Sequence, residues 1–299
     1  MPNTLFHLAI QVPLFSRVLR AGDIHYVLMG AIVPDLPWIL QRLVAGFELD
    51  PLDLRAYCIV QSSLFFCVVF SAGLALCFHY AIRGFALLSL GCLVHLLLDA
   101  IQTKFANGVL LVAPLDWHLL NFGWLLPEHW LFAVGSVLGL VVLFWQRRAL
   151  LEAVPRITKS SRRFAAAVLC ALVYLVLPWI WHDQAYRANH HFIQTLSDSA
   201  HMESSLVLEI DRGRFVPNPR PHIRAGTGQV FSVEGLPLSQ PETVSTKGRL
   251  EVGGHYVVEH YMQHTKGWRD SLSIVGLLAL LFIWSYGFGK RLVMRQPNH

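Results

Sequence analysis

Apolar segments of near-spanning length constrain this chain more than any other feature. They lie at 57–80, 84–101, 129–146, 164–182 and 271–288. A helix needs roughly 20 apolar residues to cross the hydrocarbon core of a bilayer. Hydrophobic residues make up 54% of the chain and charged residues 14%, whereas a soluble domain carries about a quarter charged residues. The sequence therefore predicts an integral membrane protein.

Two more apolar segments, at 4–16 and 24–41, precede these spans. The second is interrupted by Pro34-Asp35-Leu36-Pro37. Prolines around a carboxylate distort a helix and expose backbone carbonyls, which a membrane tolerates only beside protein or a wet cavity. Residues 1–42 are therefore either two spans or a re-entrant or interfacial hairpin. The predicted fold is an α-helical polytopic membrane protein of about 5–7 segments.

The distribution of positive charge predicts the orientation. Loop 147–163 carries several basic residues against the single Glu152, so it should be cytoplasmic. Alternating outward from it places 102–128 and 183–270 outside and the C-terminus inside. We expect a bacterial inner (cytoplasmic) membrane protein, in which the net charge of +5 comes partly from cytoplasmic arginines.

The segment 183–270 differs from the rest of the chain because it is polar. It begins with a predicted helix from His182 to Ser205 and then turns β-like. The strand candidates are Val207–Ile210, Gln229–Val233 and Arg249–Tyr261, separated by Gly and Pro turns. Short strands at this spacing suggest a small β-rich barrel or sandwich, an OB-like barrel being one form.

The predicted domains are thus a helical domain at 1–182, an extracytoplasmic helix and β domain at 183–270, and a final span with a cytoplasmic tail at 271–299. The β domain has no basic stripe, which argues against nucleic-acid binding. Its histidines His255, His260 and His264 do not share one strand face, so we expect them on the surface.

His95 and Asp99 form an ionisable pair inside the segment 84–101. Their spacing of four residues puts both side chains on one face of a helix. Ionisable groups are costly in a membrane segment and usually mark a functional site. A His and an Asp one turn apart can both reach one cation. The alternative is a His–Asp hydrogen bond that locks two helices together.

Other ligand-type side chains are predicted at the same, outer end of the membrane domain. His7 and Asp35 should lie in the outer half of their segments. The remaining candidates lie in or beside loop 102–128 and are Asp116, His118, Glu128 and His129. Convergence from four parts of the chain favours a metal or acid–base site over a purely structural pair.

The N-terminal half resembles the YdjM/YbcI-type membrane-bound metal-dependent hydrolases. Three motifs carry the resemblance: His7 in Thr4-Leu5-Phe6-His7; Gly30 through Val33-Pro34-Asp35; and His95 through Asp99. Thr103, Gly108 and Pro114 follow the last motif. The resemblance covers about residues 1–130 and implies that His7, Asp35, His95 and Asp99 bind a metal.

The sequence departs from this family at one motif. Where the family has HRGxTHS, this chain has Arg55 and then Gln61-Ser62-Ser63, and Gln is a poor zinc ligand beside His or Cys. Three explanations remain open. His118 or His129 substitutes as a ligand, the metal is harder and favours oxygen, or catalysis is lost while the fold is kept.

These observations predict a membrane-embedded hydrolase that uses a divalent metal, expected to be zinc, at the outer leaflet. Asp116, His118, Glu128 and His129 are candidates for a missing ligand or a catalytic base. A lipid phosphate or phosphodiester is the favoured substrate, and a lipid ester or amide is second. The alternative is a non-catalytic membrane scaffold whose outer β domain binds a protein partner.

Overall fold

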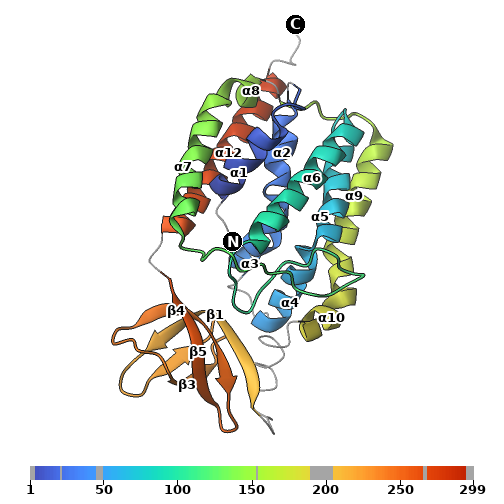
Figure 1. Cartoon of the computed structure of the whole chain (residues 1–299). Coiled ribbons are helices and arrows are strands. Elements are labelled where there is room, and N and C mark those ends of the chain that lie inside the picture. Colours follow the sequence, from blue (N-terminus) through green and yellow to red (C-terminus); the bar gives the residue numbers. More distant parts are fainter. Residues whose placement is uncertain are drawn as a thin grey trace, which may run out of the picture.

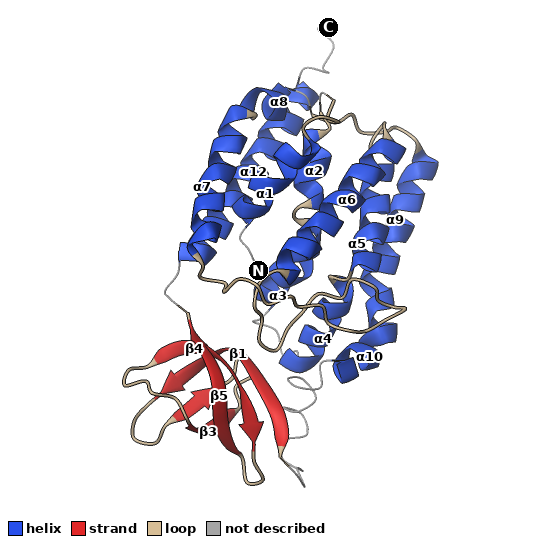
Figure 2. Ribbon diagram, in the orientation of Figure 1, coloured by secondary structure: helices blue, strands red, loops and turns tan. Residues whose placement is uncertain are grey.

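The computed structural model consists of a bundle of helices and a five-stranded β-barrel (Figure 1). It describes residues 4–20, 22–44, 50–152, 154–188, 205–264 and 268–293. The barrel lies against one end of the bundle, and the last helix of the chain ends at the opposite end. Figure 2 shows that helices and strands are fully segregated between these two parts.

The helices of the bundle differ widely in length, from short 3₁₀ turns to long apolar helices. They are α1 (Thr4–Phe15), α2 (Ile24–Gly30), the 3₁₀ helix η1 (Val33–Asp35), α3 (Leu36–Val44), α4 (Pro51–Gln61), α5 (Leu64–Leu76), α6 (Ala81–Ala100), α7 (Trp130–Trp145), α8 (Arg147–Glu152), α9 (Ser161–Val176), the 3₁₀ helix η2 (Leu177–Trp181), α10 (His182–Ala188) and α12 (Trp268–Val293).

Three helical stretches among the described residues are long and apolar enough to cross a membrane. They are α6, the run Ser161–Ala188, and Ser271–Lys290 within α12. α1 and α7 are apolar but shorter. The structure thus supports a membrane protein, while the predicted count of 5–7 segments stays a prediction.

The predicted span at 57–80 corresponds to α4 and α5, which together are long and apolar enough to cross a membrane as one bent span or to form a re-entrant loop. The helix breaks between α4 and α5, whose axes differ by 67°. Ser63 adopts an extended backbone conformation at the break, and the Leu64 N–H donates to the carbonyl of Leu110, 3.2 Å away. The loop after α6 therefore supplies a hydrogen bond at this break.

The predicted interruption at Pro34 and Asp35 is confirmed. α2 ends at Gly30, η1 covers Val33–Asp35, and α3 begins at Leu36. Proline has no N–H to continue the helical ladder. The chain therefore tightens into a 3₁₀ turn, in which the Asp35 N–H donates to Ile32 O at 2.8 Å.

Two close helix–helix contacts depend on glycine. A Cβ at Gly30 would lie 2.6 Å from the carbonyl oxygen of Leu88, where α2 crosses α6. A Cβ at Gly139 would lie 2.1 Å from the carbonyl oxygen of Leu5, where α7 crosses α1. Small residues let helix backbones approach closely in membrane bundles. These contacts hold α2 against α6 and α7 against α1.

The barrel confirms the predicted β-rich domain. Its strands are β1 (Leu206–Val216), β2 (His222–Arg224), β3 (Val230–Glu234), β4 (Glu242–Leu250) and β5 (His255–Gln263). They close in the order β1-β2-β3-β5-β4, with β3 and β5 parallel and the other pairs antiparallel. The single predicted strand Arg249–Tyr261 is instead the end of β4, a turn and most of β5. The turn contains Gly253 and Gly254, both with positive φ.

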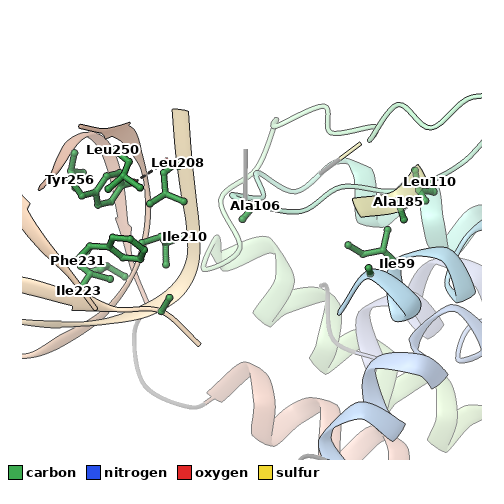
Figure 3. Packing of buried hydrophobic residues seen from close by; sticks show 14 of the residues in the cluster. Ile59, Ala106, Leu110, Ala185, Leu208, Ile210, Ile223, Phe231, Leu250 and Tyr256 are labelled. Atoms are coloured by element: carbon green, nitrogen blue, oxygen red, sulfur yellow. Dashed lines mark hydrogen bonds between the residues drawn. The ribbon is translucent and has the colours of Figure 1, made fainter. Parts of the chain in front are cut away.

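Apolar side chains from every strand fill the barrel (Figure 3). The largest is Tyr256, whose hydroxyl donates to Leu208 O at 3.0 Å and so satisfies its polar end inside the core. The predicted helix His182–Ser205 is present as α10 over His182–Ala188; residues 189–204 lie outside the described residues, and Ser205 is not helical.

Ala106 joins the barrel to the bundle. Figure 3 shows it between the barrel core and the cluster around Ile59. Its N–H donates to Glu209 Oε2 on β1 at 2.7 Å, and its carbonyl accepts from Arg55 Nη2 on α4 at 2.9 Å. The barrel is therefore anchored on the long loop 101–129 between α6 and α7.

Candidate metal centre

Four predicted ligands meet at the barrel-side end of the bundle, and we call them the His/Asp cluster: His7, Asp35, His95 and Asp99. His7 Nε2 lies 3.6 Å from Asp99 Oδ1. His95 Nε2 lies 3.5 Å from Asp35 Oδ1 and 4.0 Å from Asp99 Oδ1. His7, His95 and Asp99 are fully or almost fully buried. The ligand atoms of His7, His95 and Asp99 thus all lie within 4.8 Å of one another, and Asp35 lies beside His95 at the edge of this group.

Local structure explains how each ligand reaches the cluster. His95 and Asp99 lie one turn apart on α6, as their spacing predicts. The 3₁₀ turn holds Asp35 where the broken helix passes α6. His7 stacks on His95, with ring centroids 3.8 Å apart and planes inclined by only 2°. Two stacked imidazolium ions would repel each other, so the arrangement suits neutral imidazole, the form that binds metals.

The tautomer of His95 is set by the backbone of α2. His95 Nδ1 lies 2.7 Å from the carbonyl oxygen of Ala31. A carbonyl oxygen only accepts, so Nδ1 must carry the proton that is donated. In neutral His95 the lone pair is then on Nε2, which faces the oxygens of Asp35 and Asp99. Histidine ligands of metals usually donate their other N–H to a carbonyl or carboxylate in this way.

The distances decide between a hydrogen-bonded pair and a shared cation. An N–H···O hydrogen bond spans about 2.7–3.2 Å, and the three His–Asp separations are 3.5–4.0 Å. Ligand atoms with bonds of about 2.1 Å to one tetrahedral zinc lie about 3.4 Å apart, and never more than about 4.2 Å. The observed spacing fits one shared cation better than direct hydrogen bonds.

Buried polar atoms of the cluster are left without hydrogen bonds. Among the described residues, the atoms that have none are both ring nitrogens of His7, Nε2 of His95, Oδ1 of Asp35 and Oδ1 of Asp99. An unsatisfied buried polar atom costs about 1–3 kcal/mol. His95 Nε2 and Asp99 Oδ1 are 4.0 Å apart, too far for a direct hydrogen bond between them, and a metal ion would satisfy these atoms together.

Lys104 is a site residue that the sequence analysis missed. Its ammonium lies 3.0 Å from Asp99 Oδ2, the carboxylate oxygen turned away from the histidines, and its side chain is only 8% exposed. Because α6 ends at Ala100, helical periodicity does not predict where Lys104 lies relative to Asp99. Only the path of the loop after α6 returns the lysine to the site.

Gln11 is a second buried polar residue that sequence patterns did not single out. It lies one turn after His7 on α1 and is fully buried. Its amide has no hydrogen-bond partner among the described residues, and its Oε1 approaches Gly91, one turn before His95 on α6. Gln11 therefore lies one helical turn from the His7–His95 stack.

The four predicted catalytic residues are placed elsewhere. Asp116 and His118 are exposed, and Asp116 Oδ1 accepts from the His118 N–H in a local turn. His129 caps α7 by accepting from Leu131 N. Glu128 faces the barrel. The structure thus does not bring His118 or His129 into the cluster as substitute ligands, because each belongs to the loop on the barrel side of α6.

Glu128 belongs to a polar chain that joins the barrel to the bundle. Its Oε1 lies 3.5 Å from Nδ1 of His264, and Nε2 of His264 lies 2.7 Å from the Ser245 hydroxyl. The expectation that His264 lies on the surface is wrong, because it is 8% exposed. Burial is the main factor that lowers the pKa of His264; Arg212 adds to this effect, and neighbouring carboxylates oppose it.

Gln61, at the position of the divergent family motif, points away from the cluster. Its amide nitrogen donates to the Tyr57 hydroxyl at 3.0 Å and to Tyr174 O at 3.1 Å. The neighbouring Ser62, in contrast, lines a small pocket beside Asp99. The other residues that line this pocket are Pro34, Trp38, Leu96, Lys104, Asn107, Gly108, Val109 and Leu110. The pocket gives Asp99 and Lys104 a common opening.

No known protein family, curated protein or solved structure matches this chain. The site must be judged on its own chemistry. Two imidazoles and a carboxylate with mutually close ligand atoms form a buried group able to hold a metal ion.

Proposed function

We propose that this protein is a membrane-embedded, metal-dependent hydrolase that acts on lipids. The observation that supports this most is the convergence of ligand atoms that lack hydrogen bonds in the His/Asp cluster. Two neutral imidazoles and the Asp99 carboxylate form a mixed nitrogen and oxygen set that suits zinc, and Asp35 beside His95 brings the number of carboxylates to two. Their combined charge of −2 balances a divalent ion.

Each residue of the chain has a distinct part in this proposal. His7, Asp35, His95 and Asp99 would hold the metal, and the Ala31 carbonyl would orient His95. A bound divalent cation supplies Lewis acidity that polarises a phosphoryl or acyl oxygen and acidifies water. The small pocket beside Asp99 would admit one oxygen atom of the reacting group. None of the four predicted catalytic side chains contacts the cluster, so we assign no general base among them.

The proposed substrate is a lipid because the site lies in a helical bundle with apolar outer faces. Exposed apolar side chains cover α7, α9 and α12, which is expected of lipid-facing helices. We further propose that the barrel end is extracytoplasmic. The basic helix α8 lies at the opposite end, which the positive-inside rule assigns to the cytoplasm.

The barrel would have one role in a hydrolase and another in the alternative, a non-catalytic scaffold. Its strand order and its one parallel pair, β3 with β5, match a five-stranded Greek-key barrel of the OB-like kind, a scaffold that binds ligands on its strand faces and loops. In a hydrolase it would brace loop 101–129 over the site. In a non-catalytic scaffold it would bind a protein partner, and the cluster would hold no metal.

Metal analysis of the full chain purified in detergent separates these functions. We expect about one equivalent of a divalent metal, zinc foremost, in the wild type. His7→Ala should reduce the metal content to background. His79→Ala is the matched control, because His79 is exposed on the segment before α6. Equal metal content in both variants, or none in the wild type, would overturn the proposal and favour the scaffold.

A further inference from the structure

Lys104 provides a positive charge that the proposed metal site does not need. Two carboxylates balance a divalent cation, so Lys104 leaves the loaded site with a net charge of +1. Its ammonium is almost fully buried, and an uncompensated charge in such surroundings is costly. A negatively charged substrate group would restore neutrality, whereas a neutral ester would not.

The ammonium group of Lys104 has hydrogen-bond donors available for a ligand. An ammonium group has three donors. Among the described residues its recorded partner is Asp99 Oδ2, at 3.0 Å. Lys104 and Asn107 line the pocket together with Ser62, and Trp38 and Leu110 add apolar surface. The pocket has a volume of about 10 Å³, room for one water-sized group such as a single phosphate oxygen, and it combines a cation and polar groups with apolar walls.

The loop around Lys104 is held in place before any ligand binds. The Lys104 carbonyl accepts from Asn121 Nδ2 at 2.7 Å, and the Thr103 N–H donates to Leu125 O at 2.8 Å. Glu209 on the barrel holds Ala106, two residues further along. A side chain on a fixed loop loses less freedom on binding, which favours affinity.

A second buried cation nearby is already engaged. Arg55 donates to Ala106 O and lies over the Trp38 ring, 6.0 Å from its centroid. Its guanidinium therefore serves the junction between the bundle and the barrel. Lys104 remains the cation that borders both Asp99 and the pocket.

We propose that Lys104 binds the phosphate group of an anionic lipid substrate, so that the reaction is on a lipid phosphate rather than a neutral lipid ester. This inference rests on the proposed metal-dependent function. A phosphate oxygen beside the cluster would accept from the free donors of Lys104 while another oxygen faces the metal position. The same chemistry would recognise free phosphate, and the apolar walls around the pocket favour the lipid.

Binding of three ligands to the full chain in lipid nanodiscs tests this proposal. The ligands are phosphatidic acid, the uncharged diacylglycerol and inorganic phosphate, each measured on protein of known metal content. We expect the wild type to prefer phosphatidic acid to diacylglycerol by at least about tenfold, because a charge-assisted hydrogen bond contributes about 1.5–3 kcal/mol. Inorganic phosphate should bind more weakly than the lipid.

Substitutions of the lysine give the second half of the test. Lys104→Met should remove most of the preference, and Lys104→Arg should keep it, because only the first removes the charge. Lys247→Met is the matched control, since it breaks a lysine–carboxylate pair with Glu209, also 3.0 Å long, on the barrel.

The outcomes distinguish this inference from the proposed function. A metal-loaded wild type without preference for phosphatidic acid overturns the lysine's role on its own, whatever the variants do. A Lys104→Met protein that keeps the preference overturns it as well. Inorganic phosphate that binds as tightly as the lipid would refute a lipid substrate. A wild type without metal refutes the hydrolase function instead.

Discussion

Replacing Asp99 with asparagine separates two roles that one carboxylate performs. Its Oδ1 faces His7 and His95, and its Oδ2 pairs with Lys104 at 3.0 Å. Asparagine keeps the size of the side chain but removes its negative charge. We therefore expect Asp99→Asn to lose the metal and, in addition, to leave the buried ammonium of Lys104 without a counter-charge.

The two losses have different magnitudes and respond to different conditions. Removing one partner of a buried ion pair costs about 3–5 kcal/mol, and this loss persists in the presence of a chelator. A metal present at 100 times its dissociation constant stabilises the folded wild type by about 2.7 kcal/mol, and a chelator abolishes this gain. The double variant Asp99→Asn with Lys104→Met should recover most of the first loss and none of the second.

Denaturant unfolding in detergent micelles, with zinc and with a chelator, measures both losses. Asp23→Asn is the matched control, because Asp23 is a buried carboxylate paired with Arg83 at 2.6 Å. It should lose stability but keep the stabilisation by zinc. If Asp99→Asn is stabilised by zinc as strongly as the wild type, Asp99 is not a ligand. If the double variant is no more stable than Asp99→Asn, the argument about Lys104 is wrong.

Three further predictions address topology, the divergent motif and pH. In a background without the native cysteines, a cysteine at Ser160 should resist membrane-impermeant thiol reagents in intact cells and one at Ser239 should react; the opposite labelling would reverse the orientation. Gln61→His should leave the metal affinity unchanged. It should lower the free energy of unfolding by about 1 kcal/mol, because the hydrogen bonds to α9 and Tyr57 are lost. Tighter metal binding would contradict the observed direction of the Gln61 side chain. Because burial lowers the pKa of His264 below its unfolded value of 6.5, the unfolded state binds the extra proton; stability is complete above pH 6.5 and falls as the pH drops below it. His264→Gln should flatten that fall in thermal unfolding from pH 7.5 to 5, and an unchanged slope would exclude His264 as its source.

Part of the site could be predicted from the sequence because it depends on residues that are close together in the chain. The spacing of His95 and Asp99 fixes their common face on any helix. The prolines around Asp35 fix the helix break, because a missing N–H acts locally. These are properties of neighbouring residues, so the sequence alone indicates them. The same holds for the barrel, whose alternating apolar residues and Gly turns predict short strands.

The rest of the site depends on packing between segments that are distant in the sequence. The approach of α2 to α6 at Gly30 brings the Ala31 carbonyl to His95, and this contact joins two residues that are 64 positions apart in the sequence. Lys104 reaches Asp99 through a loop whose path is set by Asn121 and by the barrel. Helical periodicity ends at Ala100 and says nothing about such a path.

The sequence by itself indicated the apolar segments of near-spanning length, the broken helix at Asp35, the β domain and the pair of His95 and Asp99, because each depends on local spacing and apolar periodicity. His7 and Asp35 were added to that pair by the predicted topology and by the family resemblance. Only the tertiary structure decided that His118 and His129 stay outside the cluster, that Gln61 faces α9 and that Lys104 pairs with Asp99. Side chains outside regular elements, and the neighbours on which a helix face packs, are chosen by contacts between distant segments. Their energies depend on burial and distance in the folded chain, which sequence spacing does not contain.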